Sequence, residues 1–262
     1  MIEHLSYSSI NLFLTCSEAW RRKYLAKEPI SSTPALLFGS AIHNTIEGYI
    51  RQRTLEHRES PSPYTLLDLW AQQWEATLLR EPQCEWGADT PAQHFNEGIR
   101  LLSNPAVAQM LNKLIPLQDE QGLFMEREIV LRVPGVPVPI KGYIDILTSD
   151  GIPGDFKTSA QSWSADKAKA ELQPLFYLAA LNQLGRTVPG LRFRHYVMTK
   201  GKTPTVQVIE TQHTWHSIFW LQELIQRIWR SIESESFVPN PNSWLCGPKY
   251  CTAWARCRGR GM

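Results

Sequence analysis

The sequence lacks a strong excess of charge of either sign. Its 262 residues carry a formal net charge of +2 at pH 7, so a grip on nucleic acid has to come from local patches rather than from the field of the whole molecule. No apolar stretch reaches membrane-spanning length, and the first residues, MIEHLSYSS, lack the basic region and apolar core of a secretion signal. We therefore expect a cytoplasmic location and no membrane partner.

Internal repeats and low-complexity segments are also missing, which excludes solenoid and fibrous architectures. What remains is the composition of a folded domain. Hydrophobic residues make up 43% of the chain, which is enough to bury a substantial core. Length and composition together fit one large domain, or one domain with a helical insertion.

Helical periodicity dominates the first half of the chain. Apolar residues recur at helical spacing over 8–25 and, with breaks, across 55–120, which we interpret as a helical insertion. Between these segments, Gly39 is expected to act as a breaker before a helix. One face of that helix carries His43 and Glu47, four residues apart.

The periodicity then changes from helical to alternating. LFMEREIVLRV, VPIKGYIDILT and IPGDFKTS predict three consecutive strands. A helical stretch follows and ends at Gly185, with Pro174 marking either a kink or the first turn of its second half. RFRHYVMTK and TVQVIET predict two more strands, which lead into a long helix over 214–233.

One predicted hairpin concentrates charged residues. In GYIDILTSDGIPGDFKTS, Asp145 lies in an apolar run, where a carboxylate needs a partner or a cation. Asp155 and Lys157 point to one face of the next strand. Asp145 can share that face only across a loop with an odd number of residues. We predict a three-residue loop or a bulge, with Ser149 facing Pro153 and Asp145 opposite Lys157.

Two carboxylates beside a lysine suit phosphodiester hydrolysis. The carboxylates can hold a hard divalent cation, while the ammonium group orients the water or stabilises charge on the phosphate in the transition state. The same pattern also describes an exposed Asp-Lys pair next to an unrelated aspartate at the edge of the core. The hairpin alone does not separate these interpretations.

The order of these residues resembles the RecB-like branch of the PD-(D/E)XK nucleases. The resemblance rests on G-x-x-D at 142–145, D-x-K at 155–157, a helical His43 upstream, and Q-x-x-x-Y at Gln173 and Tyr177. It implies an α/β fold with a mixed central β-sheet flanked by helices, in a single domain over 1–262. The nuclease core would then occupy about 121–212, and a C-terminal helix with a cysteine-rich tail would occupy 213–262.

The resemblance also implies roles for individual residues. His43, Asp145, Asp155 and the carbonyl of Phe156 would hold Mg²⁺ or Mn²⁺, and Lys157 would act on the attacking water. Gln173 and Tyr177 would position the substrate and the catalytic groups. Taken alone, His43 with Glu47 could be an ordinary helix pair, and Gln173 with Tyr177 could simply cover the edge of the core.

A further acid is implied on the first strand of the core. Glu126 and Glu128 are both candidates, and their spacing of two residues places them on the same face of a regular strand. We favour Glu128 as the residue in the site.

Four of the five cysteines form a separate pattern. Cys246, Cys251 and Cys257 lie in the tail, Cys16 lies on the first predicted helix, and Cys84 is left over in the insertion. In a cytosolic chain, four such thiols favour a metal over disulfides, and all-cysteine ligation suits zinc or an iron-sulfur cluster.

The one-plus-three arrangement is similar to that of the iron-sulfur nucleases of the AddB type and of the CRISPR-adaptation exonuclease family. It implies a [4Fe-4S] cluster. Four residues separate Cys246 from Cys251, where those families commonly have two, so zinc remains the alternative.

We therefore expect a metal-dependent DNA exonuclease that acts on single-stranded ends. The expected setting is recombination, repair, phage DNA processing or CRISPR adaptation, with proteins of recombination or CRISPR adaptation as candidate partners. WRRKY and WARCRGR could contact the DNA backbone and stack bases, or simply keep helices soluble. The alternative function is a non-catalytic nucleic-acid-binding accessory module stabilised by a metal cluster.

Overall fold

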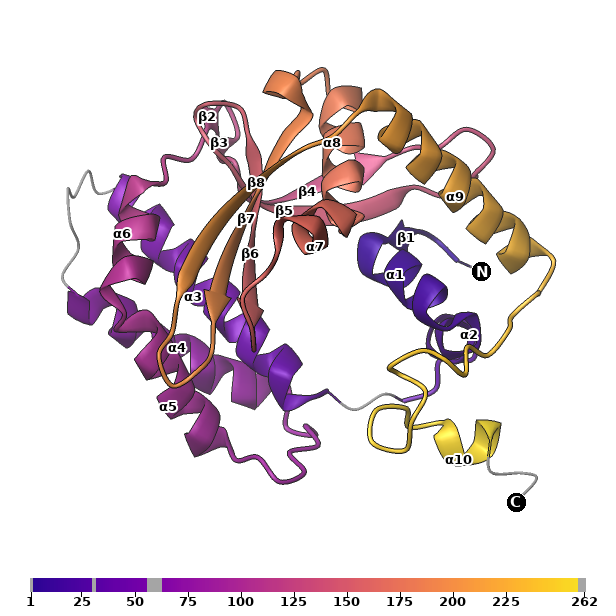
Figure 1. Ribbon diagram of the computed structural model, residues 1–262, viewed down its shortest axis with the longest axis horizontal. Helices are drawn as coiled ribbons and strands as arrows, with labels where there is room; N and C mark the ends of the chain where they lie inside the picture. Colours follow the sequence, from indigo (N-terminus) through magenta and orange to yellow (C-terminus); the bar gives the residue numbers. More distant parts are fainter. Residues whose placement is uncertain (1, 30–31, 56–62, 259–262) are drawn as a thin grey trace.

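The computed structural model describes residues 2–29, 32–55 and 63–258. Figure 1 shows a curved central sheet with helices packed on both of its faces. The sheet contains β1 (Leu5–Ser6), β4 (Met125–Leu131), β5 (Ile140–Leu147), β6 (Pro153–Ser159), β7 (Arg192–Thr199) and β8 (Val206–Gln212). A separate two-stranded ribbon is formed by β2 (Gln118–Asp119) and β3 (Gly122–Leu123).

The helices fall into two groups on opposite sides of this sheet (Figure 1). One group contains α1 (Tyr7–Thr15), α2 (Ser17–Tyr24), α8 (Gln173–Gln183) and α9 (Trp215–Glu233). The other contains α3 (Pro34–Leu55), α4 (Pro63–Arg80), α5 (Pro91–Leu102) and α6 (Pro105–Lys113). Short elements complete the chain: α7 (Ala165–Ala170), the 3₁₀ turn η1 (Pro189–Leu191) and α10 (Trp254–Cys257). Within the described ranges, none of the helices combines the length and apolar character needed to cross a bilayer.

The sheet is mixed. Its strand order is β1-β5-β6-β7-β8, and β4 pairs with β5 in addition. The β1–β5 and β6–β7 pairs are parallel, whereas the other pairs are antiparallel. Since parallel neighbours need a crossover connection, α7 and α8 carry the chain from the end of β6 to the start of β7.

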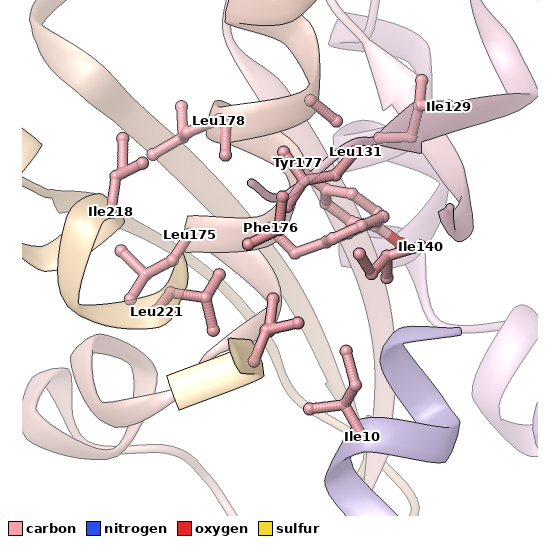
Figure 2. Close-up of a cluster of buried hydrophobic side chains, with 14 of the residues drawn as sticks. Ile10, Ile129, Leu131, Ile140, Leu175, Phe176, Tyr177, Leu178, Ile218 and Leu221 are labelled. Carbon is pink, nitrogen blue, oxygen red and sulfur yellow. The ribbon is translucent and has the colours of Figure 1, made fainter. Parts of the chain in front are cut away.

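Each face of the sheet has its own hydrophobic core. Figure 2 shows part of the core between the sheet and the helices α8 and α9, in which Leu178 lies beside Ile218 and Phe176 lies beside Ile140. The core on the opposite face lies between the sheet and the four helices α3, α4, α5 and α6. The strands contribute Met125, Ile146, Phe156, Tyr196 and Met198 to it. Tyr177 of α8 belongs to the first core and Phe156 of β6 to the second, so the candidate catalytic residues lie at the boundary between the two.

The predicted order of strands and the long C-terminal helix are confirmed. Pro174 lies in the first turn of α8, where its missing N–H is no loss. The single helix predicted over 8–25 is wrong, because Cys16 adopts an extended backbone with φ −166° and ψ 106° and separates α1 from α2. Gly39 does not precede a helix, since α3 begins at Pro34 and includes it. A glycine inside a helix costs only about 1 kcal/mol.

Candidate active site

The candidate site lies where β5 and β6 part. The two strands pair at Ile146–Gly154 and Leu147–Pro153. Thr148 closes the turn through a 3.1 Å hydrogen bond from its N–H to the Ile152 carbonyl. The loop therefore has three residues, as predicted, but it begins one residue earlier. Continuing the pairing places Asp145 opposite Asp155, which corrects the expectation that it lies opposite Lys157.

Where the backbone pairing of β5 with β6 ends, the side chain of Asp145 takes the place of a backbone hydrogen-bond acceptor. Oδ2 of Asp145 accepts a 2.7 Å hydrogen bond from the backbone N–H of Phe156. The same oxygen lies 3.4 Å from Nδ1 of His43, on α3. Asp145 is 6% exposed and Asp155 1% exposed, so both carboxyl groups are enclosed by the protein.

A third acidic side chain joins this pair. The ligand atoms of His43, Glu126 and Asp145 all lie within 4.8 Å of one another. One imidazole and two carboxylates form a donor set that suits divalent cations. Glu126 reaches this position through a left-handed backbone, with φ 45°.

Glu128 is the sequence candidate that the structure places elsewhere. It is exposed, and its carboxylate accepts hydrogen bonds from Nζ of Lys141 at 3.2 Å and from the hydroxyl of Tyr143 at 3.1 Å. The positive φ at Glu126 breaks the alternation of the strand, so residues two apart no longer share a face. The structure therefore places Glu126, and not the favoured Glu128, beside His43 and Asp145.

Lys157 stands at the centre of a chain of polar contacts. Its Nζ lies 2.6 Å from Oδ2 of Asp155 and donates to Oε1 of Gln173 at 2.7 Å. Nε2 of Gln173 donates to the hydroxyl of Tyr177 at 2.7 Å, and this hydroxyl donates to the Tyr143 carbonyl at 2.6 Å. The D-x-K and Q-x-x-x-Y segments therefore act as one hydrogen-bonded unit.

A glycine allows α8 to approach the sheet at this point. A Cβ added to Gly142 would come within 2.5 Å of Cε1 of Phe176, closer than side chains pack. The close approach brings Gln173 and Tyr177, on the first turns of α8, over β5 and β6. This gives a physical reason for the glycine in G-x-x-D.

The electrostatics of the site are dominated by buried carboxyl groups. Burial, followed by repulsion from Asp155, raises the pKa of Asp145 to about 6. Burial and then the charges of Asp145 and Glu47 raise the pKa of Glu126 to about 8. Burial works against the charge of Lys157, but Asp155 and Asp145 outweigh it and raise its pKa. The buried carboxyl groups therefore repel one another, and a bound divalent cation would offset this repulsion.

The site also includes Tyr7 and His195, which no sequence motif marks. Tyr7, at the start of α1, has a pKa raised by burial and by the nearby charges of Glu171 and Asp155. His195 of β7 pairs with Asp155 in the sheet and is fully buried. Neither of its ring nitrogens has a hydrogen-bond partner among the residues that the structure describes. No spacing rule marks a tyrosine or histidine at such positions.

The structure also gathers the four cysteines that the sequence grouped. Cys16, Cys246, Cys251 and Cys257 line one small cavity, and all four are free thiols. Figure 1 shows the C-terminal segment running back past α2. Cys84 packs instead against the helical side of the fold.

Contacts outside the cysteines hold the tail in place. The Ser17 hydroxyl donates to the Val238 carbonyl at 3.0 Å and accepts from the Val238 N–H at 2.7 Å. Arg256 lies 2.7 Å from Glu28 in an ion pair. A cavity lined by four thiols with no disulfide fits a cysteine-ligated metal.

The fold of this chain is similar to that of a solved structure. A solved structure from Eubacterium rectale, named "Putative exonuclease", matches with a TM-score of 0.64 at 14% identity, covering 98% of this chain and 88% of that one. At that identity the likeness shows a shared fold. The structure of SSO0001 matches with a TM-score of 0.36 at 14% identity, covering 97% of this chain and 98% of that one. A search of curated proteins gave no match.

The sequence itself matches a family model. The model of the PD-(D/E)XK nuclease superfamily covers residues 4–258, a range that includes every polar residue of the candidate site. Nucleases of this kind use divalent metals, in agreement with the donor set around Asp145. The chain belongs to the PD-(D/E)XK nuclease superfamily.

Proposed function

We propose that this protein is a divalent-metal-dependent DNA exonuclease. The observation that carries the proposal is the convergence of two groups at the fork between β5 and β6. His43, Glu126 and Asp145 form a metal-binding donor set, and Lys157 lies beside Asp155 at 2.6 Å. Membership of the nuclease superfamily supports hydrolysis of phosphodiester bonds as the chemistry.

The residues divide into two roles in this proposal. His43, Glu126, Asp145 and Asp155, with the carbonyl of Phe156, would hold Mg²⁺ or Mn²⁺. When bound, such an ion supplies Lewis-acid activation of water and stabilises charge on the phosphate. These five positions come from α3, β4, β5 and β6, so the ion would also tie the helical side of the fold to the sheet.

Lys157 is the group that acts on the water. Its pKa is raised above the ordinary value, so at neutral pH it carries a proton and orients the nucleophile as a hydrogen-bond donor. Gln173 accepts a hydrogen bond from Nζ of Lys157 and itself donates to the hydroxyl of Tyr177. We assign Gln173 and Tyr177 to positioning Lys157.

The finer features of the proposal concern the substrate and the second cofactor. We propose single-stranded DNA with a free end as the preferred substrate, with α3 to α6 forming a roof that a strand must thread. We propose a [4Fe-4S] cluster on Cys16, Cys246, Cys251 and Cys257, supported by the cavity that the four thiols line. Zinc at the same thiols is the alternative.

An assay on matched linear and circular DNA tests the function. End-labelled linear single strands, linear duplexes and a circular single strand of the same sequence are incubated with the protein and Mg²⁺ or Mn²⁺. We expect degradation of the linear single strand from an end and resistance of the circle. Asp155→Ala should abolish cleavage while the fold remains intact.

The remaining outcomes are equally informative. Equal rates on the circle and the linear strand would indicate an endonuclease. DNA binding without cleavage under either metal would favour the non-catalytic accessory module.

A further inference from the structure

The position of Glu126 depends on a strained backbone. Its φ of 45° lies in the left-handed region, which costs a non-glycine residue of order 1–3 kcal/mol and persists only where the surroundings enforce it. The same conformation turns the Glu126 carboxylate toward His43 and Asp145. The contacts that enforce this conformation therefore control the geometry of the site.

The contacts of Arg127 hold the backbone on the C-terminal side of Glu126. The guanidinium group of Arg127 donates to Asp119 at 2.6 Å and 2.9 Å and to the Gly122 carbonyl at 3.2 Å. It also lies 4.1 Å from the centre of the Phe124 ring. These contacts fix the residue after Glu126 to the β2–β3 ribbon.

Arg51 holds the backbone on the N-terminal side of Glu126. Nη2 of Arg51 donates to the carbonyl of Met125 at 2.7 Å, and Nε donates to Oε1 of Glu47 at 2.6 Å. Met125 is the residue immediately before Glu126, so this carbonyl belongs to the peptide unit whose rotation sets the left-handed φ. Met125 is itself buried in the core beneath α3.

Three polar residues that follow one another along α3 share one face. His43, Glu47 and Arg51 follow one another at intervals of four residues, so they form a continuous row along the helix. His43 points at Asp145, while Arg51 holds the backbone next to Glu126. One helix therefore supplies a metal-binding side chain directly and positions another.

We propose that Arg51 is a positioning residue for the metal site, acting through the backbone of Glu126. Its two-pronged contact with Glu47 and the Met125 carbonyl keeps the Glu126 carboxylate in the donor set. This inference rests on the proposed function, because it concerns the same cation. It assigns to Arg51 a role that neither the family motif nor the chain order of the ligands indicates.

Mn²⁺ binding to the full-length protein tests this role without using activity. Affinity is measured by isothermal titration calorimetry for wild type, Arg51→Met, Glu126→Gln and the double variant. We expect Arg51→Met to weaken Mn²⁺ binding by about 10-fold or more, as loss of a group that orients a ligand typically does. Because Arg51 acts through Glu126, adding Arg51→Met to Glu126→Gln should weaken binding little further.

Arg192→Met is the matched control. Arg192 also contacts a carbonyl, that of Pro189 at 3.3 Å, and a glutamate, Glu210 at 3.2 Å. Its side chain is 40% exposed, against 36% for Arg51. It lies at the start of β7, away from the donor set, so its variant should bind Mn²⁺ as wild type does. Arg51→Lys keeps the positive charge but loses the guanidinium group that contacts two acceptors at once. It should weaken Mn²⁺ binding less than Arg51→Met does.

The outcomes separate this inference from the proposed function. A wild-type protein that binds no Mn²⁺ overturns the metal site and this inference together. A wild type that binds Mn²⁺, with Arg51→Met unchanged or with its loss adding in full to that of Glu126→Gln, overturns the role of Arg51 alone. Melting curves in EDTA show whether each variant is folded. If Arg51→Met does not fold, the Mn²⁺ affinity of Arg51→Lys tests the role of Arg51 instead.

Discussion

The backbone N–H of Phe156 donates a 2.7 Å hydrogen bond to Oδ2 of Asp145. This bond joins the two acidic motifs at the point where the pairing of β5 with β6 ends. The carboxylate therefore has a structural task even without a cation. Substitutions at Asp145 should consequently separate the structural role from the catalytic one.

Asp145→Asn and Asp145→Ala should both abolish cleavage but differ in stability. Asparagine keeps an oxygen that can accept the Phe156 N–H, whereas alanine leaves that buried donor unpaired at a cost of about 1–3 kcal/mol. We expect the alanine variant to melt at a lower temperature in EDTA. Equal melting temperatures for the two variants would contradict the assignment of this hydrogen bond.

Lys157→Ala should retain metal binding and lose most of the rate. The expected loss is on the order of 10²-fold, typical of a group that acts on the nucleophile. Gln173→Ala should lose less, because Asp155 still holds the ammonium group at 2.6 Å. Single-turnover rates at saturating Mn²⁺ give the ranking, and a larger loss in Gln173→Ala would count against it.

Cys16→Ser should release the proposed metal from the four-cysteine cavity and lower the melting temperature. Cys16 and the three tail cysteines line the same cavity, so one missing thiol removes the link between the two ends of the fold. Elemental analysis and absorption spectra of anaerobically purified protein measure the metal. Zinc without iron in wild type would replace the cluster with a zinc site, and an unchanged melting curve with metal retained would reject the link.

His195 should contribute a loss of stability to the metal-free protein in acid. Burial lowers the pKa of His195 to about 4, from an ordinary 6.5, because it outweighs the opposing charge of Asp155 and is helped by the charges of Lys157 and His213. The unfolded chain then takes up a proton before the folded one does. The stability contributed by the neutral ring is present above pH 6.5 and is lost as the pH falls toward 4.

His195→Phe removes this titration. In EDTA, lowering the pH from 6.5 to 4 should lower the melting temperature of wild type relative to that of the variant, whatever the buried carboxyl groups contribute to both. Parallel curves would show that His195 does not titrate in this window.

The hairpin shows how far sequence reasoning reaches. Alternation and loop parity were sufficient to place Asp145 on the same face as Asp155 and Lys157, because the period of a strand is fixed. The position of the loop was off by one residue, since Thr148 rather than Ser149 closes the turn. That choice depends on hydrogen bonds within the turn, and several registers satisfy the same pattern.

Glu126 shows where sequence reasoning stops. A rule based on alternation cannot foresee a left-handed residue near the start of a strand, and a glutamate gives no local signal for one. The conformation is enforced by Arg51 and Arg127, which reach it from α3 and through the β2–β3 ribbon. The break at Cys16 is similar, because the tail packs beside it, where Nδ2 of Asn240 donates to the Thr15 carbonyl at 3.1 Å.

The contact between Ser17 and Val238 spans 221 residues of sequence. At synthesis rates of about 5–20 residues per second, the first partner leaves the ribosome roughly 10–40 s before the second is made. The contact between Ser17 and Val238 therefore forms late and cannot guide the early collapse of the sheet. Its contribution should appear in the rate at which the finished protein opens, and much less in the rate at which it folds.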